Sequence, residues 1–337
     1  MAVATLAKMA NRQPQRRLRF AAAPYLCVPA TRRVKAEFDI EIAERTYPPN
    51  LADLKRDWVS SVAAPAFAIL ARQRAPDMRR RFCTIGTGSG VDALAAVEIL
   101  GADRIAITDL FEDVVTIAAA NVNANVAASV EIKLVAGAGD LLTGLAADAG
   151  PFDVVYENLP NLPLADATAI ALGWTSGAHF APRVEAVPEF VRWQDLTLHW
   201  LALAAARPWL AAEGVVLSTI GSRLLLATIA EMSRTAGYAP RALTYGWKLQ
   251  ADADELIPIH AARQAQGFGP FCFYPAEVLQ ATFDAIDPET AGIRAFEIEA
   301  ALARSGLDAV AALEAHRHGV LIGHTYVVLA SSLRPTP

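Results

Sequence analysis

Apolar runs alternate with amphipathic stretches through the central part of the chain. The apolar run at 82–85 is followed by glycines and then by a helical pattern over 91–100. The same succession of strand and helix recurs downstream. Strands are expected at 104–109, 131–136, 152–158, 214–220, 241–249 and 321–330, and helices at 111–125, 193–209 and 223–236. Alternation of this kind predicts a parallel sheet with helices on both faces.

The regions flanking this alternation have a different pattern. Residues 36–80 are expected to be helical, with a Tyr47-Pro48-Pro49-Asn50 break before a helix over 51–73 that Pro65 kinks or divides. Helical patterns also lie at 276–286 and 296–315. We predict four parts: a basic, helical N-terminal extension and possible lid (1–80), a Rossmann-like core (81–249), a helical insertion covering the site (250–318), and a final strand and tail (319–337).

Composition excludes two broad classes of protein. The chain has 337 residues, 54% of them hydrophobic, which is enough to form a large core and excludes wholesale disorder. Its net charge of −5 argues against a general nucleic-acid binder. Residues 1–36 are nevertheless basic and contain no acid. This segment is a solvated extension, a lid over an anionic site, or a transit peptide, which is typically rich in arginine.

Cysteine and histidine usage gives no sign of a metal or a disulfide framework. The three cysteines form no cluster, and their odd number argues against paired bridges. The histidines near the C-terminus, His316, His318 and His324, lack a completing carboxylate or cysteine pattern. The longest apolar region, 196–220, is broken by charged residues and is too polar to span a membrane. Without a secretory signal either, we expect a cytoplasmic protein with no metal and no membrane partner.

A glycine-rich loop, Gly86-Thr87-Gly88-Ser89-Gly90, follows the first core strand and begins a helix. Glycines allow the backbone to turn sharply and to approach a ligand closely. Asp109 follows nineteen residues after Gly90, at the end of the next strand, where an acid can accept hydrogen bonds from ribose hydroxyls. The third glycine of the dinucleotide fingerprint is replaced by Val91, which weakens a nicotinamide-dependent alternative, and no P-loop lysine is present.

Residues 83–161 resemble the class I S-adenosylmethionine-dependent methyltransferases, and most closely the subgroup with an Asn-Pro-Pro-Tyr type motif. The resemblance is carried by residues 84–90, 107–109 and 152–161. It implies an α/β, doubly wound fold whose seven-stranded sheet has an antiparallel last strand. It also implies S-adenosylmethionine as cofactor, with Asp109 at the ribose and Asp140 at the adenine amine. The implied cofactor contacts are Gly86, Thr87, Gly88, Gly90, Asp109, Leu110, Asp140, Leu141 and Asn158.

The chain departs from this family pattern at two places. The family usually has an acid two residues before the first glycine, where this chain has Thr84, so the methionine end of the cofactor is expected to be held differently. The Asn-Pro-Pro-Tyr motif becomes Asn158-Leu159-Pro160-Asn161, which lacks the aromatic residue that stacks on a planar base or amide. This second change argues against DNA adenine or protein glutamine as the substrate.

Methyl transfer is an in-line displacement in which the protein mainly positions the reactants. Asn158 can accept N–H bonds and orient a nitrogen lone pair, although a residue at this place can also be an end-of-strand cap. Tyr156 either points to the site or packs in the sheet, and Glu157 is expected to support the site or to be exposed. His179 is either a base or an ordinary loop histidine.

The sequence therefore predicts an enzyme that methylates a nitrogen or oxygen of a small molecule, because the two extensions are expected to enclose the site. Substrate contacts are expected from Tyr47, Asn161, Trp174 and Ser176. One alternative is a cyclase that converts S-adenosylmethionine itself into azetidine-2-carboxylate and methylthioadenosine. Another is a non-catalytic nucleotide-binding module. The acceptor and the oligomeric state are not predicted.

Overall fold

The computed structural model describes residues 16–163 and 179–334. Its centre is a sheet whose main path runs β10-β12-β9-β6-β3-β4-β5. β3, β4, β5, β6 and β9 are mutually parallel, and β12 is antiparallel to both of its neighbours. These strands are β3 (Arg81–Ile85), β4 (Arg104–Asp109), β5 (Lys133–Ala138), β6 (Phe152–Glu157), β9 (Leu210–Ser222), β10 (Tyr238–Leu249) and β12 (Ile322–Leu333), with β11 (Tyr274–Pro275) paired to β12. The predicted doubly wound α/β fold with an antiparallel last strand is confirmed.

Both faces of the sheet are buried, as expected for parallel strands. Along β6, Val154 and Tyr156 belong to one apolar core, whereas Val155 belongs to the other. The first core is covered by α3 (Ala64–Gln73), α4 (Val91–Ala95) with its continuation Ala96–Leu100, and α5 (Glu112–Asn125). The second is covered by α8 (Thr197–Ala206) and α9 (Leu226–Thr235), with the shorter α7 (Glu189–Trp193) preceding α8. The period-two alternation of burial therefore produces a three-layer core.

The N-terminal region contains a two-stranded antiparallel sheet that the sequence analysis did not predict. β1 (Arg16–Ala21) pairs with β2 (Glu37–Ile42), and α2 (Ala22–Tyr25) lies between them in the chain. The prediction of a helix over 37–42 is wrong. Phe38, Ile40 and Ile42 are buried at every second position, which is the period of a strand. The helix expected from residue 51 begins only at Val59, as a π-helical turn (Val59–Ala63) that continues into α3.

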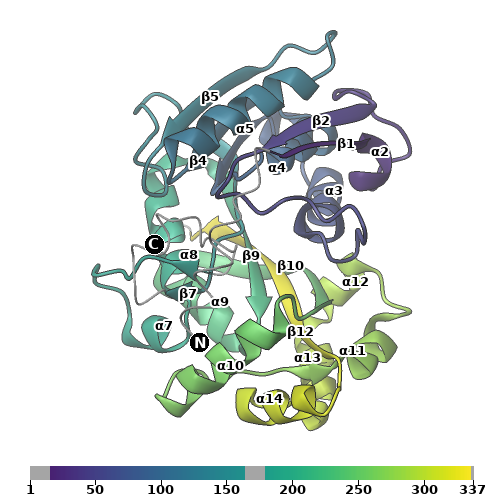
Figure 1. Cartoon of the computed structure of the whole chain (residues 1–337). Helices are drawn as coiled ribbons and strands as arrows, with labels where there is room; N and C mark the ends of the chain where they lie inside the picture. The colour runs from purple at the N-terminus through teal and green to yellow at the C-terminus, as the bar shows by residue number, and fades with distance from the viewer. Residues whose placement is uncertain (1–15, 164–178, 335–337) are drawn as a thin grey trace.

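The polar edge of this small sheet is bound to α5 by two asparagines. Asn121 and Asn125 donate from their amide nitrogens to the carbonyl oxygens of Glu41 and Asp39, at 2.8 and 3.0 Å. Their side-chain oxygens accept from the backbone N–H groups of the same two residues. These bonds satisfy an otherwise open strand edge. They hold the N-terminal segment against the core, beside α5 and α3 (Figure 1).

Residues 250–318 form a helical layer at the β10–β12 end of the sheet (Figure 1), and the prediction that this layer covers the site stays a prediction. The helix at 253–265 was not predicted, and the pattern at 296–315 corresponds to two helices rather than one. The layer comprises α10 (Ala253–Ala265), α11 (Ala276–Phe283), α12 (Pro288–Ile293), α13 (Ala295–Leu302) and α14 (Ala309–Arg317). In the described part of the chain, no helix is both long and apolar enough to cross a membrane.

Candidate functional site

The carboxyl ends of three adjacent strands define the candidate site. β3 ends at Ile85, β4 at Asp109 and β6 at Glu157. The strand order reverses between β3 and β6, because the chain first moves from β3 toward β5 and then returns to β6 and β9. Open α/β sheets bind ligands in the crevice at such a reversal. The residues that follow these strand ends are therefore the candidates for ligand contact.

The glycine loop turns through a conformation that favours glycine. Gly86, Gly88 and Gly90 have φ values of +73°, +56° and +81°. The N–H groups of Gly86 and Thr87 both donate to the Thr108 carbonyl at 2.9 Å, which fixes the loop to the end of β4. The loop leads directly into α4, which begins at Val91.

Asp109 lies beside this loop, as the sequence predicted. Its carboxylate accepts a hydrogen bond from the Gly88 N–H at 3.1 Å. Burial raises the pKa of this carboxyl, and hydrogen bonds from the backbone of Gly88, Phe111 and Leu110 oppose that rise. Leu110, expected to pack on the adenine ring, has 53% of its surface exposed. The position suits a ribose acceptor, although the roles of both residues stay predictions.

The segment after β6 packs directly on the first glycine. A Cβ placed on Gly86 would lie 2.9 Å from Cδ2 of Leu159, so no larger residue fits there without movement. The Leu159 N–H donates to the Glu157 carboxylate at 3.2 Å. Asn158 lies between these two residues and is partly buried. The backbone of Asn158 is therefore held at the corner where the glycine loop meets the end of β6.

A buried hydrogen-bonded pair supports this corner. Nδ1 of His199, on α8, lies 2.9 Å from each carboxylate oxygen of Glu157, and neither side chain is exposed. Nε2 of His199 is buried and has no hydrogen-bond partner among the described residues. Glu157 is thus buried beneath the segment rather than exposed. His199 was not predicted as a site residue, and its only signal is that it stands in a helix that is otherwise apolar apart from Thr197.

Tyr156 is located in the core beneath the site. Its ring packs against Phe67 and Phe82, and only 2% of its surface is exposed. Its hydroxyl is 3.4 Å from the Thr219 hydroxyl. Of the two predicted alternatives, this geometry favours packing in the sheet over a catalytic role.

Asp92, in the first turn of α4, is a buried carboxylate that the sequence analysis did not single out. Its oxygens accept hydrogen bonds from the hydroxyls of Thr84 and Thr87, the latter at 3.2 Å, and from the Ala93 N–H at 2.8 Å. Burial raises the pKa of Asp92 to about 6, although these hydrogen bonds oppose the rise. The only signal in the sequence was the spacing: Asp92 follows eight residues after Thr84, and Thr84 stands where the family has an acid.

Asp140, expected at the adenine amine, forms an ion pair with Arg183. Two guanidinium nitrogens of Arg183 lie 2.7 Å from the two carboxylate oxygens, which is a bidentate arrangement. The adjacent Leu141 has a φ of +54°, so the backbone turns sharply after Asp140. The adenine role of Asp140 stays a prediction, and it would have to coexist with this ion pair.

The segment 46–58 begins beside the glycine loop and is attached to the end of β10 and to the turn that follows it. A Cβ on Gly88 would be 3.3 Å from Cγ2 of Thr46. The hydroxyl of Tyr47, although 54% of this residue is exposed, donates to Asp252 at 3.2 Å. Nζ of Lys248 donates to the carbonyls of Lys55 and Asp57 at 3.0 and 2.8 Å. We refer to residues 46–58 as the covering segment, and its role as a lid stays a prediction.

The remaining predicted substrate residues are placed only in part. The amide of Asn161 donates to the Asp195 carbonyl at 3.4 Å, which directs it toward the segment before α8. The backbone of His179, in β8 (His179–Phe180), pairs with Leu162 in β7 (Leu162–Pro163). Trp174 and Ser176 lie outside the described residues. The catalytic role of His179 and the substrate roles of these residues stay predictions.

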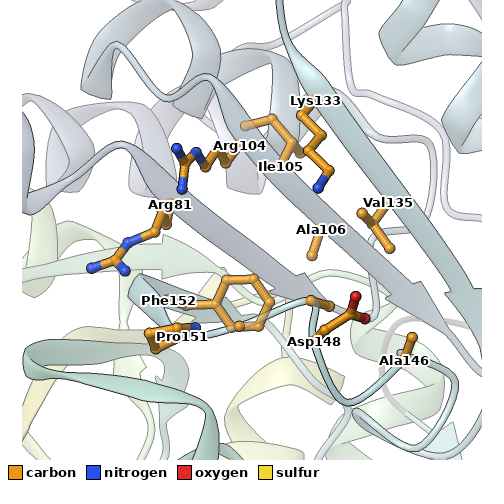
Figure 2. Close-up of a pocket in the computed structure, with 12 residues that line it drawn as sticks. Arg81, Arg104, Ile105, Ala106, Lys133, Val135, Ala146, Asp148, Pro151 and Phe152 are labelled. Carbon is orange, nitrogen blue, oxygen red and sulfur yellow. The ribbon is translucent and has the colours of Figure 1, made fainter.

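A cavity of about 400 Å³ lies elsewhere on the sheet (Figure 2). Arg81, Arg104 and Lys133, which begin β3, β4 and β5, line part of it. Asp148 and Phe152 line another part. The basic residues lie at the amino ends of the strands, a full strand length from the glycine loop. This cavity is therefore separate from the candidate site.

The residues at the carboxyl edge fit a nucleoside-bearing cofactor. The glycine loop exposes backbone close to the end of β3, and Asp109 supplies a carboxylate beside it. Asn158 follows the end of β6 at the same corner, between Glu157 and Leu159. Within the described residues, no group of three or more histidine, cysteine or acidic side chains is arranged to hold a metal ion.

Comparison with known proteins gives a consistent family. Residues 67–168 match the family model described as ribosomal protein L11 methyltransferase (PrmA). The chain is 31% identical over 167 residues to the release factor glutamine methyltransferase of Deinococcus radiodurans, an alignment that covers 47% of this chain and 51% of that protein. The chain thus spans about half the length of this curated relative.

Solved structures of methyltransferases are also similar, at low identity. A ribosomal protein L11 methylase from Lactobacillus delbrueckii subsp. bulgaricus matches with a TM-score of 0.31 and 19% identity, covering 55% of this chain and 69% of that one. A precorrin-6y C5,15-methyltransferase from Geobacter metallireducens matches with a TM-score of 0.35 and 11% identity, covering 79% and 86%.

The expectation of a small-molecule partner is corrected by the family model and the curated relative. One is named for ribosomal protein L11 and the other for glutamine of a release factor, and both of these acceptors are proteins. A small substrate was expected because the two extensions were expected to enclose the site. That inference is weak, because a covering segment can admit a single side chain of a protein.

Proposed function

Because this chain belongs to the class I S-adenosylmethionine-dependent methyltransferases, we propose that it transfers the methyl group of S-adenosylmethionine to a nitrogen atom of a protein. The observation that carries this proposal is the corner at which the glycine loop meets Asn158. Leu159 packs on Gly86, so the two segments that would hold the methyl donor and the acceptor are in direct contact. We further propose a cytoplasmic setting, which is supported by the three cysteines, all of them free.

The residues at the edge have separable tasks in this proposal. The glycine loop and Asp109 would bind the nucleoside part, and Asn158 would orient the acceptor. The cofactor supplies an electrophilic methyl carbon when it is bound. Transfer of that methyl group to the acceptor nitrogen would leave S-adenosylhomocysteine, and the proton lost by the nitrogen would pass to solvent. Asn158 contributes a carboxamide oxygen that can accept an N–H bond and so direct the nitrogen lone pair.

Glu157 and His199 would position the segment that contains Asn158 without touching the reacting groups. The Glu157 carboxylate accepts the Leu159 N–H and is itself fixed by His199. Because both side chains are fully buried, the segment containing Asn158 rests on a rigid support. A side chain positioned by such contacts loses little freedom when the acceptor binds.

The experiment is product analysis with purified protein and S-adenosylmethionine. One arm contains the cofactor alone, and two others add recombinant, unmethylated ribosomal protein L11 or release factor. We expect S-adenosylhomocysteine only when a protein acceptor is present, together with a mass increase of one methylene on that acceptor. Methylthioadenosine formed from the cofactor alone would replace this proposal with the cyclase alternative. Cofactor binding without turnover in any arm would contradict a methyl transfer to these proteins.

A further inference from the structure

The question left open by Thr84 is which group receives the positively charged amine of the cofactor's methionine. We infer that Asp92 performs this role, so that a carboxylate on the first turn of α4 replaces the acid that the family has in β3. The inference rests on the proposed function and adds a binding residue to it. It starts from the hydrogen bonds around Asp92 and the position of Thr84 in the sheet.

Thr84, which stands where the family has an acid, is hydrogen-bonded to Asp92. The Thr84 hydroxyl donates to one oxygen of the Asp92 carboxylate, and Thr87 donates to the other at 3.2 Å. The two threonine hydroxyls therefore fix the plane of the carboxylate. The family's acid would stand at position 84, and Asp92 is hydrogen-bonded to the residue at that position. The negative charge of Asp92 therefore lies in the same part of the site as the charge of the family's acid.

This position lies between the two ends of the proposed ligand. Thr84 pairs with Ile107 of β4 on one side and with Tyr156 of β6 on the other. A ligand whose ribose binds at Asp109 and whose methyl group faces Asn158 must pass from the end of β4 to the end of β6, across the end of β3. The amino-acid part of that ligand then lies near the residues bound to Thr84.

Asp92 is a buried carboxylate whose hydrogen-bond donors among the described residues are uncharged. In the described part of the chain, no lysine, arginine or histidine forms an ion pair with it, and only 5% of its surface is exposed. A buried carboxylate that lacks a counter-ion is costly unless a ligand provides the charge. Burial raises the pKa of the nearby Tyr25, and the charges of Asp57 and Asp92 raise it further. An ammonium group is the ligand chemistry that matches this environment.

A purely structural role for Asp92 makes a different prediction. In that case the carboxylate would only fix the glycine loop to α4, and its loss would weaken every ligand of the loop to the same extent. A role toward the amine affects only ligands that carry the amine. S-adenosylhomocysteine carries the amino-acid part, whereas methylthioadenosine has the same nucleoside and sulfur without it. Comparing these two compounds therefore separates the roles.

The test is calorimetric titration of the whole chain with each compound. For Asp92→Asn we expect affinity for S-adenosylhomocysteine to fall at least tenfold and affinity for methylthioadenosine to change less than twofold. The matched control is Asp109→Asn, which should weaken both compounds equally because both contain the ribose. Thr84→Val keeps the carboxylate but removes one of its two orienting hydroxyls, and should weaken S-adenosylhomocysteine alone, to a smaller extent.

A rescue variant completes the experiment. Thr84→Asp combined with Asp92→Ala returns the acid to the position that the family uses, and should regain most of the affinity for S-adenosylhomocysteine. Equal losses for both compounds in Asp92→Asn, or no loss for either, would overturn the inference while leaving the proposed function intact. Failure of the unmodified protein to bind either compound would overturn the proposed function and the inference together.

Discussion

Glu157 and His199 form a fully buried pair in which one imidazole nitrogen contacts both carboxylate oxygens at 2.9 Å. Such a pair contributes little if both partners are removed together, but removing one leaves a buried polar group without a partner. The same carboxylate accepts the Leu159 N–H. The pair therefore connects the interior of α8 to the segment that contains Asn158.

Glu157→Ala should lower the free energy of unfolding by about 3–5 kcal/mol, because it strands His199 in the core. Glu157→Gln keeps a hydrogen-bonding group of the same shape and should cost less. Urea denaturation followed by circular dichroism measures both. Glu289→Ala is the matched control, since it removes a carboxylate from a partly exposed pair with Arg72 and should cost less than about 1 kcal/mol. A loss for Glu157→Ala no larger than that of the control would contradict this account.

Gly88 and Gly267 both have positive φ values, +56° and +95°, but differ in their surroundings. An added Cβ would lie 3.3 Å from Thr46 at Gly88 and would meet nothing within 4 Å at Gly267. Alanine at either position should cost roughly 1–2 kcal/mol of stability through the backbone alone. Only Gly88→Ala should also weaken binding of S-adenosylhomocysteine, by calorimetry, because the loop and the covering segment must move apart. Equal affinity in the two variants would show that Gly88 is not near the ligand.

The order of the core elements could be predicted because strands buried on both faces have distinctive apolar runs. Val154-Val155-Tyr156 is an example of such a run. The glycine loop and Asp109 could be placed because each comes directly at the end of such a run. The strand at 37–42 was missed because its alternation of apolar and acidic residues is short and lies next to helical patterns. The bond of Asp92 to Thr84 and that of His199 to Glu157 could not be predicted, since the partners are 8 and 42 residues apart in the chain and are brought close only by the fold.

Lys248 fastens the covering segment, residues 46–58, to the end of β10. Burial lowers the pKa of Lys248 to about 7, and its Nζ binds the carbonyls of Lys55 and Asp57 and lies 4.9 Å from the ring centre of Trp58. Lys248→Met keeps much of the apolar volume and removes these contacts, worth about 1–3 kcal/mol. Backbone amides of the covering segment should then exchange hydrogen faster by mass spectrometry. Lys133→Met, at the amino end of β5, is the control, and equally fast exchange in both variants would contradict the fastening role.

Asp92 should make stability depend on pH in a defined direction. Its pKa is raised from 3.8 to about 6 by burial, so between these values the unfolded chain loses a proton that the folded chain keeps. The folded state is therefore destabilised as pH rises through this window, by up to about 3 kcal/mol, and the penalty then stays constant at higher pH.

Asp92→Asn removes this titration. The free energy of unfolding of the variant, relative to the unmodified protein, should therefore rise as pH increases from about 4 to about 6. Denaturation curves across this range measure the difference. Thr84→Val keeps the carboxyl but removes a hydrogen bond that lowers its pKa, so its window should extend to higher pH. If Asp92→Asn gains stability at neutral pH and binds S-adenosylhomocysteine poorly, this carboxylate is retained for its ligand at a cost to the fold. If the difference in stability between the variant and the unmodified protein does not depend on pH, Asp92 does not titrate as a buried group with a raised pKa.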